Sequence, residues 1–210
     1  MPSALTLQSL PLFPLGTVLF PDGVLPLRVF EVRYLDMIGR CHKAGAPFGV
    51  VSLTQGSEVR QPGKSETFAG VGTLATISSM ETPQPGLMMI RVSGAQRFRI
   101  TSRDQLKHGL WVADVAGLAP DVAVAVPGDL KITADALEKV ILSLEARAGS
   151  PDEVPIKRPW RLGDCGWVAN RWCELLPLPV QLKQQLMELD NPLVRLELVS
   201  DVLSRTGIAT

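Results

Sequence analysis

Apolar residues and prolines alternate closely over residues 10–34, and this pattern frames the rest of the chain. Four prolines stand there among leucine, valine and phenylalanine: Pro11, Pro14, Pro21 and Pro26. Each proline removes a backbone donor and fixes φ, so this spacing excludes an ordinary helix. The segment is also too apolar for a solvated linker. It therefore predicts short extended pieces that bend at prolines and pack against a core.

Helical periodicity follows this segment. Apolar side chains recur at helical spacing at Phe30, Tyr34, Met37, Ile38 and Cys41. The pattern predicts a helix over 28–43 that ends at Gly45. Near its start, Arg28, Glu31 and Arg33 are expected to form a local set of salt bridges.

The next part of the chain has the signals of short strands. Five segments are β-branched or alternate between apolar and polar positions: 48–54, 69–78, 87–92, 96–102 and 110–118. Gly94 and Ala95 separate two of them, and 55–66 is predicted to be a polar surface loop. Several short strands with one helix among them favour a compact antiparallel barrel or sandwich.

The pattern changes at residues 120–129, a linker of alanine, valine, proline and glycine. Four helices are predicted beyond it: an amphipathic one over 133–144, one capped by Asp164, one with Pro179 in its first turn and one opening at Asn191. The chain therefore divides into a β-rich part over 1–120 and a small helical bundle over 121–210, an α+β organisation.

Charge and cysteine usage narrow the class of protein. Lys plus Arg and Asp plus Glu both number 21, so the net charge is zero and gives no nucleic-acid footprint. The three cysteines, Cys41, Cys165 and Cys173, have no metal spacing and indicate intracellular thiols. The N-terminus lacks a basic residue before its proline-broken apolar run, which argues against a signal peptide, and no apolar run has the length of a membrane span. A soluble cytoplasmic protein is expected.

Catalytic motifs fail on their context. Gly63-Lys64-Ser65 resembles the end of a phosphate-binding loop, but Glu58 stands where that motif needs glycine. Residues 70–75 have the letters of a dinucleotide fingerprint within a predicted strand, so Gly70 and Gly72 are interpreted as easing a bend or bulge. Neighbours on a helix point about 100° apart, so Cys41 and His42 are not expected to form a nucleophile–base pair. No catalytic, cofactor or metal residue is predicted.

Two clusters could form binding surfaces. Arg91, Arg97, Arg99 and Arg103 surround Phe98 and could present a basic face to RNA, although simple alternation, with Phe98 and Ile100 in the core and the arginines in solvent, is favoured. Met80, Met88 and Met89 could form a flexible apolar surface, with core filling the favoured interpretation.

The sequence resembles the Lon N-terminal (substrate-binding) domain family over about residues 8–205. The opening run PLFPLGTVLFPDGVLPLRVFEVRY carries the resemblance most specifically, and Asp22-Gly23 departs from it where the family often has glycine directly after the L-F-P turn. Later matches follow in order: Phe48-Gly49-Val50-Val51, Gly72-Thr73-Leu74-Ala75, Arg97-Phe98-Arg99-Ile100, Leu176-Pro177, Gln184-Gln185-Leu186-Met187-Glu188 and Arg195-Leu196.

The resemblance implies a fold and a function. The fold is a PUA-like β pseudo-barrel followed by a helical bundle. The ATPase and Ser–Lys protease modules of Lon proteases have no counterpart in these 210 residues, so a stand-alone recognition domain is expected and not an enzyme. The implied function is non-catalytic binding of exposed apolar segments of unfolded or partly folded proteins, with an RNA-binding PUA-like module as the alternative. The family carries over no cofactor and no site residue, so the binding residues stay unnamed.

Overall fold

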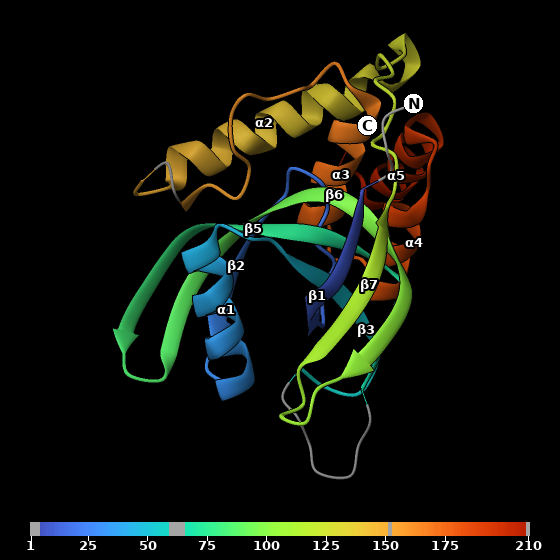
Figure 1. Ribbon diagram of the computed structural model, residues 1–210. Helices are drawn as coiled ribbons and strands as arrows, with labels where there is room; N and C mark the ends of the chain where they lie inside the picture. Colours follow the sequence, from blue (N-terminus) through green and yellow to red (C-terminus); the bar gives the residue numbers. More distant parts are fainter. Residues whose placement is uncertain (1–4, 59–65, 151–152, 209–210) are drawn as a thin grey trace. The chain divides into compact units, whose positions relative to one another are not determined.

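The computed structural model describes residues 5–58, 66–150 and 153–208, and it divides into two compact units (Figure 1). The first unit, Met1–Pro120, contains β1 (Thr6–Leu15), β2 (Val24–Val29), α1 (Val32–Ala44), β3 (Phe48–Gln55), β4 (Thr67–Phe68), β5 (Val71–Gln84), β6 (Leu87–Gln105) and β7 (Trp111–Gly117). The second unit, Asp121–Thr210, contains the short 3-10 helix η1 (Gly128–Leu130), α2 (Lys131–Arg147), α3 (Cys165–Leu175), α4 (Val180–Glu188) and α5 (Pro192–Thr206).

The strands of the first unit close into a barrel. Their order is β1-β7-β6-β5-β3-β4, and β1 also pairs in parallel with β3, with Leu12 opposite Gly49. This second pairing joins the two sides of the sheet, so the barrel alternative is correct and the sandwich is wrong. The closing pair is parallel, however, where the sequence predicted an antiparallel barrel. Among the strands that the structure describes, β2 pairs with β6 alone. The prediction of short extended pieces in the proline-containing segment is confirmed by β1 and β2.

Gly94 lies inside one continuous strand, β6, where the sequence predicted two strands separated at Gly94 and Ala95. A Cβ at this position would lie 2.1 Å from the carbonyl oxygen of Phe20. The Gly94 N–H donates to Gly23 O at 2.8 Å, and Gly94 O accepts from the Asp22 N–H at 2.9 Å. The glycine therefore lets the turn after β1 cross the strand closely and does not end it.

Gly72 has a similar explanation. A Cβ there would lie 2.4 Å from the carbonyl oxygen of Val50 in β3, whereas a Cβ at Gly70 would have nothing within 4 Å. Gly72, which belongs to the sequence with the letters of a dinucleotide fingerprint, is therefore required because two backbones approach closely here, and not because the strand bends. Gly63-Lys64-Ser65 lies outside the described residues.

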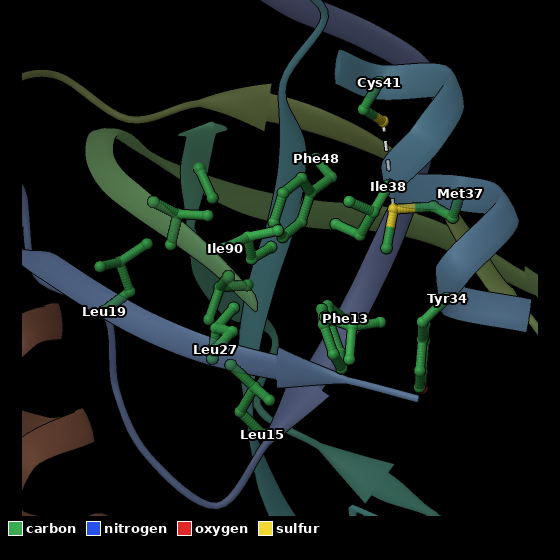
Figure 2. Close-up of a cluster of buried hydrophobic side chains, with 14 of the residues drawn as sticks. Phe13, Leu15, Leu19, Leu27, Tyr34, Met37, Ile38, Cys41, Phe48 and Ile90 are labelled. Atoms are coloured by element: carbon green, nitrogen blue, oxygen red, sulfur yellow. Dashed lines mark hydrogen bonds between the residues drawn. The ribbon is translucent and has the colours of Figure 1, made fainter. Parts of the chain in front are cut away.

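Helix α1 begins at Val32 and not at Arg28, because Leu27, Arg28 and Val29 continue β2. It ends as predicted, with Gly45 in the left-handed conformation at φ 61°. Its inner face packs into the main core of the unit (Figure 2). That core consists of Phe13, Leu15, Leu19, Leu27, Val29, Tyr34, Met37, Ile38, Cys41, Phe48, Val50, Ala75, Ile90, Val92 and Leu110.

The helices of the second unit have the predicted caps. The Asp164 carboxylate accepts from the Trp167 N–H at 2.8 Å, and the Asn191 side chain accepts from the N–H groups of Leu193 and Val194. Helix α3 is buried on all sides over its first nine residues and packs against α2, α4 and α5. An all-round buried helix needs no amphipathic stripe, which is why two tryptophans, Trp167 and Trp172, fit on it.

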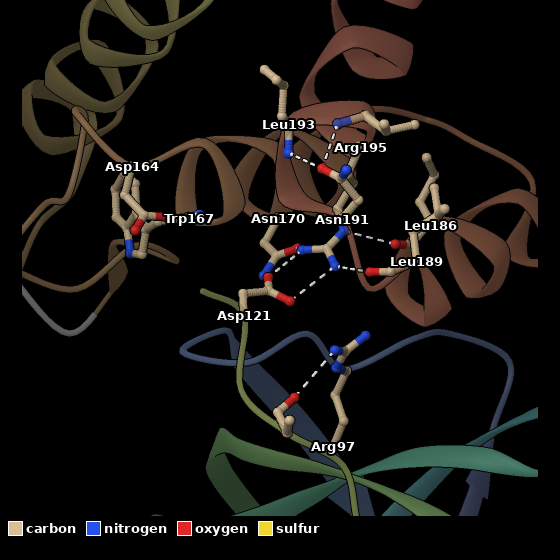
Figure 3. Close-up of polar contacts among 12 residues, drawn as sticks. Arg97, Asp121, Asp164, Trp167, Asn170, Leu186, Leu189, Asn191, Leu193 and Arg195 are labelled. Carbon is tan, nitrogen blue, oxygen red and sulfur yellow. Dashed lines mark hydrogen bonds and ion pairs between the residues drawn. The ribbon is translucent and has the colours of Figure 1, made fainter. Parts of the chain in front are cut away.

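A buried arginine in α5 connects several segments of the second unit. The guanidinium of Arg195 donates to both carboxylate oxygens of Asp121, at 2.5 and 3.2 Å, and to Asn170 Oδ1 at 3.0 Å (Figure 3). It also donates to the carbonyl oxygens of Leu186 and Leu189. One side chain therefore ties the start of the unit to α3, to the end of α4 and to α5.

None of the helices in the described part of the chain is both long and apolar enough to cross a membrane.

Candidate binding site at the edge of strand β2

A cavity of about 370 Å³ opens in the first unit. Its lining comes from the end of β1 and the residues after it, from β2, from the start of α1 and from Glu58. The lining residues are Phe13, Leu15, Thr17, Leu25, Pro26, Leu27, Arg28, Val29, Phe30, Glu31, Tyr34 and Glu58. All of them except Glu58 lie within the proline-containing segment 10–34, but its pattern of prolines and apolar residues does not show which side chains face a cavity, so the sequence named no binding residues.

The cavity follows the edge of β2. All residues from 25 to 31 line it, although successive side chains of a strand point to opposite faces. Leu27 and Val29 are buried, whereas Pro26 and Arg28 are exposed. A cavity on one face would be lined by every second residue, so a continuous run of lining residues places the opening along the backbone edge.

Tyr34 forms part of the wall from helix α1. Its ring stacks on Phe13 with 4.2 Å between centroids, and the Arg33 guanidinium lies over it at 4.5 Å. The Tyr34 oxygen is buried and has no hydrogen-bond partner within the described residues. Burial raises the pKa of this hydroxyl, so the group keeps its proton and can donate.

The charges around the cavity differ from the predicted salt-bridge set. Arg33 pairs with Glu31 at 3.3 Å and with Glu66 at 3.1 Å, and it donates to Gly109 O at 2.7 Å. Arg28 takes no part, because it continues β2 with its side chain exposed. The predicted set is thus correct for Glu31 and Arg33 and wrong for Arg28.

Exposed apolar residues occur at and next to the cavity. Phe30, in its lining, is 51% exposed, and Val32, at the start of α1, is 80% exposed. Met89 is 41% exposed and lies directly opposite Arg28 across the β2–β6 ladder. Met80 and Met88 instead pack against the core, so core filling is correct for two of the three methionines.

The arginines of β6 do not form the face that RNA binding would need. Phe98 is fully buried, and Arg97 is only 4% exposed and donates to Ala119 O at 3.4 Å. The prediction of solvent-facing arginines is therefore wrong for Arg97, because a register shift beside it interrupts the strand alternation. Arg103 lies over the rings of Phe68 and Trp111, at 4.9 and 5.9 Å.

The cysteines are buried thiols. Burial raises the pKa of Cys41 and raises that of Cys173 to about 12, which disfavours the nucleophilic thiolate. His42 is exposed, so it does not share the surroundings of the Cys41 thiol. Within the ranges that the structure covers, no three His, Cys, Asp or Glu side chains form a cluster suited to a metal ion.

Removing the unpartnered hydroxyl tests this description of the wall. The variant Tyr34→Phe should keep the free energy of unfolding or raise it by up to about 1 kcal/mol, because a buried polar group without a partner carries only its desolvation cost. Urea denaturation monitored by tryptophan fluorescence measures this. A loss of more than about 1 kcal/mol would show that the oxygen has a stabilising partner.

Comparison with known proteins identifies the family to which this chain belongs. Residues 9–205 match the family model described as the ATP-dependent protease La (LON) substrate-binding domain. The chain belongs to this family. The match concerns the substrate-binding part of Lon, which is non-catalytic.

Individual relatives agree with this assignment. Lon protease 2 of Herpetosiphon aurantiacus is 30% identical over 97% of the chain, and Lon protease of Anaeromyxobacter dehalogenans is 29% identical over 93%. The chain spans about a quarter of the length of these curated relatives, 24% and 23%. The crystal structure of a Lon N-terminal domain protein from Xanthomonas campestris is 31% identical, with a TM-score of 0.71 over 93% of this chain and 98% of that one. The N-terminal domain of a Mycobacterium avium complex Lon protease shares the fold at 20% identity, with a TM-score of 0.60 over 94% of this chain and 98% of that one.

Proposed function

We propose that the cavity along β2 and the exposed apolar residues beside it bind apolar segments of unfolded or partly folded proteins, without chemical change to them. The observation that carries this proposal is the open, mainly aliphatic and aromatic wall next to Phe30, Val32 and Met89. A concave site with apolar margins is typical of recognition of apolar groups. Membership of a substrate-binding family supports the same function.

The energetics favour weak binding with little salt dependence. Each apolar side chain that becomes buried contributes about 1.5–3 kcal/mol, while association costs about 4–15 kcal/mol in lost freedom. For a segment that buries a few such side chains the two contributions nearly cancel, so the binding is weak. Because apolar burial drives it, raising the salt concentration should change the affinity little.

The test uses a fluorescently labelled, permanently unfolded polypeptide and anisotropy at tens of micromolar protein. The double variant Phe30→Ser, Val32→Ser should weaken binding about fivefold or more, because it removes two exposed apolar side chains at the cavity margin. The matched control Ile132→Ser, Leu142→Ser removes two exposed apolar side chains from α2 and should leave the affinity unchanged.

Two results would contradict the proposal. One is no binding of the unfolded polypeptide at tens of micromolar, and the other is an equal loss in the two double variants. No specific observation supports RNA binding, because Phe98 and Arg97 are buried.

A further inference from the structure

Strand β2 has one backbone edge that no other described strand covers. Among the described strands it pairs with β6 only. The Gly94 N–H donates to Gly23 O, which makes the Gly23/Gly94 position a hydrogen-bonded one, and such positions alternate along an antiparallel ladder. Leu25, Leu27 and Val29 then turn their backbone groups towards β6.

Val24, Pro26 and Arg28 accordingly turn their backbone groups away from β6, towards the free edge. Pro26 has no N–H to offer there, and edge positions are where a strand tolerates proline. Within the described residues no hydrogen bond is found for the carbonyl oxygens of these three residues or for the N–H groups of Val24 and Arg28, so these groups remain for another strand. The cavity runs along this same edge, with Phe13, Leu15 and Tyr34 in its wall (Figure 2).

We infer that this edge takes an extended segment of a partner protein as an added strand, and that the preferred segment is apolar with an acidic side chain beside Arg28. The inference rests on the proposed function and specifies its geometry and its ligand chemistry. An added strand would lie about 4.8 Å from β2 and would point every second side chain to the same face. Apolar side chains on that face can fill the cavity.

The charges in the cavity lining favour an acidic side chain on the added strand. Among the described residues, three charged ones line the cavity: Arg28, Glu31 and Glu58. Glu31 is paired with Arg33, and Glu58 accepts from the Gly16 N–H at 2.5 Å. Arg28 is exposed, and within the described residues it has no ion partner. A side chain directly opposite on an added strand comes within about 5 Å, so a carboxylate there complements Arg28.

The backbone part of the inference is tested with N-methylated peptides. The probe is an eight-residue peptide of alternating leucine and serine with one glutamate, titrated by fluorescence anisotropy. Because an added strand uses the N–H of every second residue, methylation of single amides should weaken binding tenfold or more at alternate positions and less than twofold at the positions between. A series without this alternation overturns strand addition.

The preference for an acidic segment is tested by changing the charge on the peptide and at position 28 of the protein. The glutamate peptide should bind three- to tenfold tighter than the same peptide with lysine, and Arg28→Glu should reverse this order. Arg28→Gln serves as the neutral variant and should remove the preference. A preference that persists in Arg28→Glu, or an initial preference for lysine, overturns the assignment of an acidic segment.

The outcomes separate the two proposals. If the unfolded polypeptide binds and responds to the Phe30, Val32 double variant while the methylation series is flat, the strand-addition inference alone is wrong. If neither the polypeptide nor the peptide binds, the proposed function is wrong as well.

Discussion

Replacing Arg195 with methionine should lower the free energy of unfolding by about 3–5 kcal/mol. The side chain is only 1% exposed, and its guanidinium bonds to a carboxylate, an amide oxygen and two backbone carbonyl oxygens. Methionine approximates the length of the side chain but donates no hydrogen bond. Asp121 and Asn170 would then lose a charged partner in a place that water reaches poorly, and this cost exceeds what apolar packing returns.

The measurement is urea or thermal unfolding of Arg195→Met beside Arg205→Met. Arg205 lies in the last turn of the same helix and is exposed, so its substitution should change stability by less than about 0.5 kcal/mol. Equal stability of the two variants would contradict the view that the Arg195 network holds the second unit together.

Replacing Gly94 with alanine should cost about 3 kcal/mol, at the upper end of what overpacking costs. The added Cβ would lie 2.1 Å from Phe20 O, and a backbone carbonyl cannot rotate away as a flexible side chain can. To remove this clash, the turn must move away from the strand. This movement breaks the two hydrogen bonds that join Gly94 to Asp22 and Gly23. The first unit should therefore unfold at markedly lower denaturant concentration.

Gly70→Ala is the matched control for this substitution. Gly70 also lies in the first unit, but a Cβ there would meet nothing within 4 Å. This variant should be neutral or slightly stabilising, because alanine restricts the unfolded chain more than glycine does. A similar loss in both variants would show that the close contact at Gly94 is not the cause.

Local signals in the sequence predicted elements that depend on local chemistry. The cap at Asp164, the cap at Asn191 and the left-handed end of α1 at Gly45 are all as expected, because each depends on residues within one helical turn. The continuity of β6 through Gly94 was not predictable. It depends on Phe20, which is far away in sequence.

The candidate site escaped prediction although all of its lining except Glu58 lies between Phe13 and Tyr34. Its wall joins Phe13, Tyr34 and the edge of β2, which local patterns treat as parts of three separate elements. The burial of Arg97 also depends on an acceptor outside its own strand, the carbonyl oxygen of Ala119, so its charge and the strand alternation alone suggested exposure. The family resemblance supplied the fold, but a family without fixed contact residues could not point to this edge.

The pairing of β1 has a consequence for the order in which the chain becomes structured during synthesis. Strand β1 leaves the ribosome before both of its neighbours, β3 and β7, and Thr6 pairs with Ala116. A nascent chain that ends before Trp111 therefore leaves the β7 side of β1 unpaired. Such long-range pairing slows folding and prolongs the exposure of aggregation-prone apolar segments. The first unit can close co-translationally only after β7 has emerged.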